Sequence, residues 1–196
     1  MRIHRLAALT AVCALAIACT GGPESGKSKA TQDPSSFLAA STAPRATAGL
    51  LDAAGKTVGL IEFGEDRVGV HVEMKVLGLP PGKHGVHVHA IGRCEAPAFT
   101  TAGGHFNPAN KRHGYLTADG PHAGDLGNLE VKANGTGELS FVTPHLSLAR
   151  ARSNSPLVGG GLAVVIHANA DDDKTDPSGN SGDRIACGLV KGRPAS

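Results

Sequence analysis

The segment Gly85-Val86-His87-Val88-His89-Ala90-Ile91 (residues 85–91) alternates histidine with β-branched valine. Such alternation is typical of a short β-strand. Because successive side chains of a strand point to opposite faces, His87 and His89 are expected on the same face. A pair of histidines two residues apart is weak evidence for a metal site when taken alone. The segment therefore predicts a strand that carries two neighbouring imidazoles.

Seven further runs of this kind lie between residue 46 and the end of the chain, with glycine and proline pairs between them. Eight short strands predict an all-β fold, an eight-stranded antiparallel Greek-key sandwich or barrel. Two gaps, 92–126 and 168–183, are too long for hairpins and are expected to be ordered functional loops. The other expected strands are Thr47–Asp52, Thr57–Phe63, Val68–Leu77, Leu129–Lys132, Gly137–Phe141, Leu162–His167 and Arg184–Val190.

The composition agrees with one β domain and an extension. The chain has 196 residues, 40% of them hydrophobic and only 3% aromatic, so it can form one core but not comfortably two. Its 27 Gly and 12 Pro favour short strands joined by turns over helices.

The N-terminus indicates export. A basic start is followed by an uncharged apolar run at 6–18, which is short for a bilayer span and typical of a signal peptide. The end of this run resembles a bacterial lipoprotein box with Cys19 as the lipid-modified residue, although Ala16 stands where such boxes usually carry Leu. Cleavage without lipid attachment remains the alternative.

Three regions follow from this interpretation: a lipoprotein-type signal peptide at 1–18, a flexible tether at 19–45 and a domain at 46–192. The protein is then expected in the periplasm or at the cell surface, anchored to a membrane only through Cys19. Removal of Arg2 and Arg5 reduces the 19 basic residues to 17, which equals the number of acidic residues. This balance gives no support for nucleic-acid binding.

The cysteines are few. Cys13 and Cys19 belong to the N-terminal region, which leaves Cys94 and Cys187. In an exported chain the remaining two are expected to form a disulfide that ties a long loop to the last strand. Two buried free thiols are the alternative.

The strongest local signal for chemistry is His105-x7-His113-x8-His122-x2-Asp125. Three imidazoles and a carboxylate form a closed ligand set suited to tetrahedral zinc. Imidazoles with an open position suit a redox-active copper better. His105 would then have to serve both metals, because few other histidines are well placed. His167, at the end of an apolar strand, would alone be expected to be a core histidine.

Taken together, these blocks resemble the copper–zinc superoxide dismutase family, most closely its exported bacterial branch. The resemblance covers about residues 46–191 and rests on six blocks. They are His84 to His89, Gly103 to Pro108, His113-Gly114, His122 to Asn128, Val164 to His167 and Gly182 to Gly188.

The resemblance implies a role for each matching residue. It implies copper bound by His87, His89, His105 and His167, and zinc bound by His105, His113, His122 and Asp125. It also implies a Cys94–Cys187 disulfide, an active-site Arg184, a structural His84 and an outer aspartate, Asp171, that hydrogen-bonds one ligand of each metal. Because Asp172 and Asp173 adjoin Asp171, this last assignment could shift by a residue.

The implied activity is dismutation of superoxide to oxygen and hydrogen peroxide outside the cytoplasm, with copper and zinc as cofactors. Two alternatives have different consequences. A copper-binding or copper-delivery domain on the same fold would bind metal without catalysis, and such relatives typically lack part of the ligand set or the arginine. A purely structural zinc domain would leave His87, His89 and His167 unexplained. The sequence leaves open whether the protein is a monomer or a homodimer.

Overall fold

Antiparallel strands make up most of the computed structural model, which describes residues 45–193. In chain order they are β1 (Arg45–Asp52), β2 (Thr57–Glu65), β3 (Val70–Leu77), β4 (Gly82–His89), β5 (Asp125–Val131), β6 (Thr136–Thr143), β7 (Ala163–His167), β8 (Arg184–Leu189) and β9 (Lys191–Arg193). Two single 3-10 turns, Thr100–Ala102 and Val158–Gly160, are the helical segments of this part of the chain. No helix within residues 45–193 is long and apolar enough to cross a membrane.

The strands close into a barrel. The order of hydrogen-bonded neighbours is β2-β3-β6-β5-β4-β7-β8-β1, and β1 also pairs with β2, so the sheet closes on itself. The expected eight-stranded Greek-key barrel is therefore confirmed. β9 was not expected; it continues β8 beyond Val190 and pairs with β1, where Arg193 lies opposite Arg45.

The strand boundaries differ from the expected ones mainly around polar residues. β4 begins at Gly82 and β5 at Asp125, each several residues earlier than the apolar pattern indicates. The two strands pair from Gly82↔Val131 to His87↔Asp125. Backbone pairing does not require apolar side chains, so polar residues such as Lys83 extend the strand unnoticed by a hydrophobic pattern.

The side chains on one face of each strand fill the interior of the barrel. On β3, Val70, Val72 and Met74 are buried while the residues between them are not. This alternation places every second residue inside. Other fully buried members of the same core are Leu50, Ile61, Phe63, Leu129, Val164 and Ile166.

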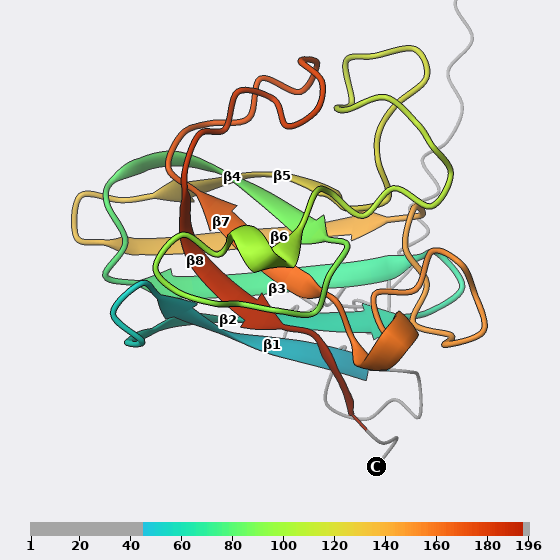
Figure 1. Ribbon diagram of the computed structural model, residues 1–196, viewed down its shortest axis with the longest axis horizontal. Helices are drawn as coiled ribbons and strands as arrows, with labels where there is room; N and C mark the ends of the chain where they lie inside the picture. The colour runs from blue at the N-terminus through green and yellow to red at the C-terminus, as the bar shows by residue number, and fades with distance from the viewer. Residues whose placement is uncertain (1–44, 194–196) are drawn as a thin grey trace, which may run out of the picture. The chain divides into compact units, whose positions relative to one another are not determined.

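β4 and β7 are buried on both faces, which locates the candidate site. Val86 and Val88 of β4 belong to the barrel core. His87 and His89 therefore project from the outer face, where they are also buried, with exposed fractions of 0% and 1%. Two long loops, 92–124 and 168–183, supply the cover, and Figure 1 shows parts of both rising from the same side of the barrel.

Residues 1–44 and 194–196 lie outside the part of the chain that the structure describes. The expected signal peptide at 1–18, the lipid-modified Cys19 and nearly all of the 19–45 tether fall in this range and remain predictions.

Candidate metal centre

Four histidines from three separate segments meet on the outer face of the barrel. His87 and His89 come from β4, and His167 ends the neighbouring β7. His105 lies in the loop, where an isolated bridge pairs it with His89. One nitrogen from each of the four lies within 4.8 Å of the others. We refer to these residues as the four-histidine group.

Backbone carbonyls fix the orientation of two of these rings. His89 donates from Nδ1 to the carbonyl of Gly103 (2.8 Å), and His167 donates from Nδ1 to the carbonyl of Gly182 (3.0 Å). The opposite nitrogens, the two Nε2 atoms, consequently carry lone pairs and face each other at 3.3 Å. Partners of this kind set the tautomer and direction of a metal-binding imidazole.

A second group lies beside the first. His105, His113, His122 and Asp125 also bring one ligand atom each within 4.8 Å of the others. We refer to them as the aspartate group, because Oδ1 of Asp125 is at its centre. This oxygen lies 3.0 Å from Nδ1 of His105 and 3.2 Å from Nδ1 of both His113 and His122.

His105 belongs to both groups. Its Nδ1 faces Asp125, while its Nε2 is on the side of the four-histidine group and has no hydrogen-bond partner. Its ring centroid is 3.9 Å from that of His87 and 5.2 Å from that of His113. This geometry places one nitrogen of a single imidazole toward each group, as a ring shared by two metal ions requires.

Unpartnered nitrogens test whether the groups suit metal ions. Among residues 45–193, three buried ring nitrogens lack a hydrogen-bond partner: Nδ1 of His87, Nε2 of His105 and Nδ1 of His113. A buried polar atom without a partner costs about 1–3 kcal/mol. Each of the three belongs to at least one of the two groups, so a metal ion that takes these nitrogens as ligands, displacing a proton where one is bound, would remove this cost. The residues fit metal ions in both groups.

The donor types differ between the groups. Four imidazoles suit a borderline metal such as copper, and three imidazoles with one carboxylate form a closed set for zinc. Both ligand sets predicted from the sequence are thus brought together.

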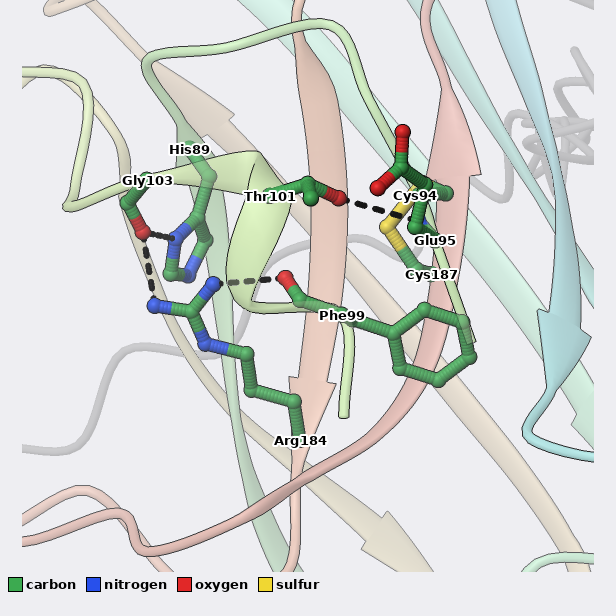
Figure 2. Close-up of a disulfide and its surroundings, with 8 residues drawn as sticks. All are labelled: His89, Cys94, Glu95, Phe99, Thr101, Gly103, Arg184 and Cys187. Carbon is green, nitrogen blue, oxygen red and sulfur yellow. Dashed lines mark hydrogen bonds between the residues drawn. A yellow bond between two sulfur atoms is a disulfide. The ribbon is translucent and has the colours of Figure 1, made fainter. Parts of the chain in front are cut away.

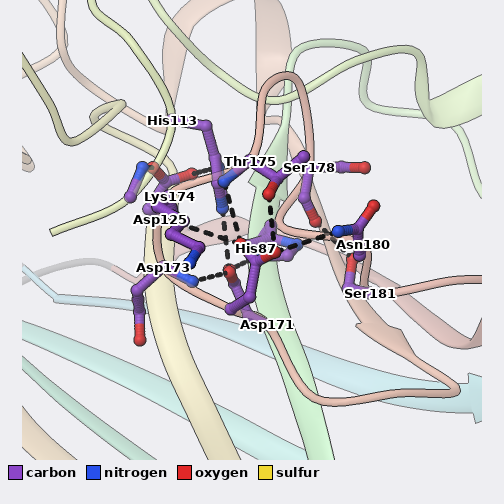
Figure 3. A network of polar contacts seen from close by, with 12 residues as sticks. His87, His113, Asp125, Asp171, Asp173, Lys174, Thr175, Ser178, Asn180 and Ser181 are labelled. Atoms are coloured by element: carbon purple, nitrogen blue, oxygen red, sulfur yellow. Dashed lines mark hydrogen bonds and ion pairs between the residues drawn. The ribbon is translucent and has the colours of Figure 1, made fainter. Parts of the chain in front are cut away.

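Asp171 hydrogen-bonds one histidine of each group. Its Oδ2 accepts from Nε2 of His87 at 2.6 Å, and its Oδ1 accepts from Nε2 of His113 at 2.9 Å (Figure 3). Asp172 instead bonds Thr175 and its neighbours. Asp171, and not an adjacent aspartate, therefore makes the contacts expected of the outer aspartate.

Burial keeps the imidazoles of the four-histidine group neutral. Loss of hydration lowers the pKa of His87 to about 3, of His89 to about 2 and of His167 to about 4. A neutral imidazole has the free lone pair that a metal needs.

The aspartate group has the opposite electrostatics. Burial opposes charge on His113, but the nearby carboxylate of Asp125 and the hydrogen bond to Asp171 outweigh it and raise the pKa of His113 to about 10. The imidazoles around Asp125 hold the pKa of its carboxyl far below the usual range despite burial. The group is therefore organised around a buried negative charge.

His84 and Arg184 flank the four-histidine group. The His84 ring lies between the carbonyls of His167 (2.8 Å) and Pro80 (2.9 Å), where it supports the end of β7. Arg184 donates from Nη1 to the carbonyl of Phe99 (2.7 Å) and from Nη2 to that of Gly103 (2.6 Å), as Figure 2 shows. Its guanidinium is thus held beside His89, which bonds the same Gly103 carbonyl.

The expected disulfide is present. Cys94 and Cys187 are joined across 93 residues of sequence, with Cα atoms 5.6 Å apart (Figure 2). A small apolar cluster of Phe99, Ala102, Ala163, Val165 and Cys187 packs beneath the segment. The disulfide therefore attaches to β8 the segment whose carbonyls hold Arg184.

A hollow of about 410 Å³ leads to Arg184 from the surface. Its charged lining residues are Arg184 and Asp183; the others are Pro97, Ala98, Thr100 and Gly182. Arg184 is the basic residue of this lining.

Sequence reasoning missed three contributions to the centre. Gly103 supplies a carbonyl, and Tyr115 donates from its hydroxyl to the carbonyl of Asp125. Asn128 holds the backbone of Asp171 through both its amide atoms, at 2.9 and 2.7 Å. Gly103 and Asn128 stand within quoted blocks, although the sequence does not indicate these contacts, and no local pattern distinguishes Tyr115.

Comparison with known proteins shows a family match. A family model described as copper/zinc superoxide dismutase matches residues 57–190. A copper–zinc superoxide dismutase of Aquifex aeolicus is 40% identical over 148 residues, which cover 75% of this chain and 86% of the relative. The superoxide dismutase-like protein YojM of Bacillus subtilis is 44% identical over 73% of this chain and 74% of its own length.

Solved structures agree with the sequence matches. The crystal structure of a superoxide dismutase-like protein from Bacillus subtilis has a TM-score of 0.69 at 43% identity, covering 73% of this chain and 96% of that one. The Cu/Zn superoxide dismutase from Brucella abortus has a TM-score of 0.61 at 30% identity, covering 74% and 98%.

Proposed function

Because this chain belongs to the copper/zinc superoxide dismutase family, we propose that it dismutates superoxide at the two groups joined by His105. The observation that carries the proposal is the placement of His105, which presents one nitrogen to each group while its Nε2 has no protein partner. A purely structural zinc domain needs only the aspartate group. It gives no reason to bury three more imidazoles beside an arginine.

We assign copper to the four-histidine group and zinc to the aspartate group. The support is the donor set of each group together with the unpartnered nitrogens of His87, His105 and His113. Asp171 supports both groups, since it fixes one imidazole from each. Asp171 accepts hydrogen bonds from Nε2 of His87 and from Nε2 of His113. The Nδ1 atom of each ring is therefore the one available to a metal ion.

Bound at these positions, copper supplies reversible one-electron exchange and zinc supplies fixed positive charge. In the overall reaction one superoxide loses an electron and becomes dioxygen. A second superoxide gains an electron and two protons and becomes hydrogen peroxide. The protein residues must therefore attract an anion, hold it and deliver a proton.

His105 is suited to deliver the proton. Its Nδ1 is fixed toward Asp125, so only Nε2 is available to gain or lose a proton on the side of the four-histidine group. A proton held at Nε2 lies where the second superoxide is reduced, and transfer from a positioned acid lowers the barrier of such a step. The other proton comes from solvent.

Arg184 is suited to attract the anion. The mature chain is nearly neutral, so its overall field offers little attraction, and a local cation has to supply it. Arg184 lines the hollow and is held beside His89 by the shared Gly103 carbonyl.

Relatives of bacterial and extracellular origin support an exported protein. We extend this to membrane attachment through a lipid on Cys19, which rests on the sequence alone. The usual lipoprotein modification supplies the several acyl chains that stable anchoring needs. Wild-type protein that stays as soluble after export as the Cys19→Ser variant would refute the lipid.

A copper-binding role without catalysis is the second candidate. The support for this candidate is that one relative is named only a superoxide dismutase-like protein. Superoxide consumption by protein loaded with both metals, compared with metal-free protein, separates the two: a copper-binding domain takes up the metals without a faster reaction.

A further inference from the structure

Two consecutive residues hold opposite ends of Asp125. The backbone N–H of Gly114 donates to the carboxylate atom Oδ2 at 2.9 Å. The hydroxyl of the next residue, Tyr115, donates to the backbone carbonyl of Asp125, also at 2.9 Å. The same aspartate is thus fixed at its side chain and at its main chain by one dipeptide.

This arrangement decides which carboxylate oxygen faces the imidazoles. Oδ2 accepts two backbone N–H bonds, from Gly114 and from His122, each 2.9 Å long. Oδ1 is consequently left at the centre of the aspartate group, 3.0–3.2 Å from three imidazole nitrogens. A backbone shift at Asp125 would move Oδ1 away from this central position.

Asp125 lies where the regular β4–β5 ladder is interrupted. Asp125 is the first residue of β5 and pairs with His87 just beyond an irregularity in the β4–β5 register. The strand is less constrained there than in its regular part. The Tyr115 hydroxyl supplies a donor to the carbonyl at this point.

Tyr115 itself is placed accurately. Gly114 has φ 86°, and a Cβ there would collide with the backbone of Asp173, so the loops touch closely at that glycine. The N–H of Leu116 donates to the carbonyl of Asp173 at 2.9 Å. Because Gly114 and Leu116 are both fixed against the second loop, the side chain of Tyr115 is held where its hydroxyl reaches the Asp125 carbonyl.

Packing does not account for this tyrosine. The residue is 46% exposed, and its aromatic neighbour is the ring of His145, with the ring centroids 6.2 Å apart. Its hydroxyl nevertheless donates to the Asp125 carbonyl at 2.9 Å.

We propose that Tyr115 is a positioning residue for the zinc ion of the aspartate group: its hydroxyl fixes the Asp125 backbone and thereby aims Oδ1 at the metal. The inference rests on the proposed function, in which this group holds zinc. It adds a residue that touches neither metal nor substrate to those that set zinc affinity.

The test compares wild type with Tyr115→Phe, which keeps the ring and removes only the hydroxyl. Zinc affinity is measured by competition with a chromophoric chelator, and cobalt serves as a visible probe of ligand geometry in the same group. We expect zinc binding about tenfold weaker, the lower end of the effect of losing an outer partner. We also expect a changed visible spectrum of bound cobalt, with copper affinity at the four-histidine group unchanged.

Leu116→Ala is the matched control, since this neighbouring side chain is 74% exposed. It should leave zinc affinity and the cobalt spectrum as in wild type. The proposal is overturned if Tyr115→Phe retains wild-type zinc affinity and cobalt spectrum. It is also overturned if the variant weakens copper and zinc equally and lowers the unfolding midpoint of metal-free protein, because that marks a general structural role. If wild-type protein binds no zinc, the proposed assignment of zinc to the aspartate group fails as well. A wild type that binds zinc and a Tyr115→Phe variant that binds it equally well refute only the role of Tyr115.

Discussion

His89 and Arg184 donate hydrogen bonds to the same acceptor, the carbonyl of Gly103, at 2.8 and 2.6 Å. One peptide unit therefore positions two groups. They are the imidazole of His89, which belongs to the four-histidine group, and the guanidinium of Arg184, which lines the hollow. That unit belongs to the segment that the Cys94–Cys187 disulfide attaches to β8.

Arg184→Gln should slow dismutation while both metals stay bound. A charge near the reacting anion contributes roughly 1–3 kcal/mol in a partly screened site, or about 10–100-fold in rate. Arg184→Lys keeps the charge and should slow the reaction less. Steady-state rates at low and high salt check this, because added salt should depress the wild-type rate more than that of the Gln variant. Full activity of Arg184→Gln at low salt, with metals bound, would leave Arg184 as a purely structural residue.

Removal of the disulfide by Cys94→Ser should destabilise the protein by about 3–5 kcal/mol, because the bond closes a loop of 93 residues in the unfolded chain. The free energy of unfolding, measured by denaturant titration, gives the value. Dismutation should also slow, since the segment that supplies the Phe99 and Gly103 carbonyls loses its attachment. Thiol titration of denatured, unreduced wild type should detect neither Cys94 nor Cys187. Detection of both would contradict the bond.

His105→Ala should disturb both groups, whereas His122→Ala should mainly remove zinc. The physical reason is that His105 offers a nitrogen to each group, while His122 contacts only the aspartate group. Elemental analysis of the two variants after equal exposure to copper and zinc is the measurement. A His105→Ala protein with full copper and zinc would rule out a shared imidazole.

Metal-free protein should lose stability as the pH falls from about 6.5 to about 4. Burial lowers the pKa of His167 to about 4 and of His87 to about 3, so in this window the unfolded chain binds protons that the folded one does not. These histidines contribute their stability fully above pH 6.5 and lose it as the pH falls through the folded values. Urea titrations at several pH values check the slope. A flat profile between pH 7 and 4 would contradict the buried neutral state.

The sequence predicted the barrel well because side-chain alternation is a local property, readable in each strand from β1 to β8. The spacing of His105, His113, His122 and Asp125 indicated the aspartate group, whereas the four-histidine group was implied by the family resemblance; the structure brings the residues of each set together. The sequence could not predict the Gly103 carbonyl as a shared acceptor, since every residue carries a carbonyl and only the fold selects one. The contact of Tyr115 could not be predicted for a similar reason: its partner is a main-chain atom ten residues away. β9 was missed because Lys191–Arg193 is polar and its pairing with β1 depends on backbone alone.

The central claim is that the two groups joined by His105 together dismutate superoxide. The most direct test measures superoxide consumption by wild-type protein after loading with copper and zinc, alongside its metal content and the metal-free protein. The account predicts rapid dismutation that requires copper and that falls sharply in His105→Ala. Wild-type protein that holds both metals in full and consumes superoxide no faster than the metal-free protein would contradict it.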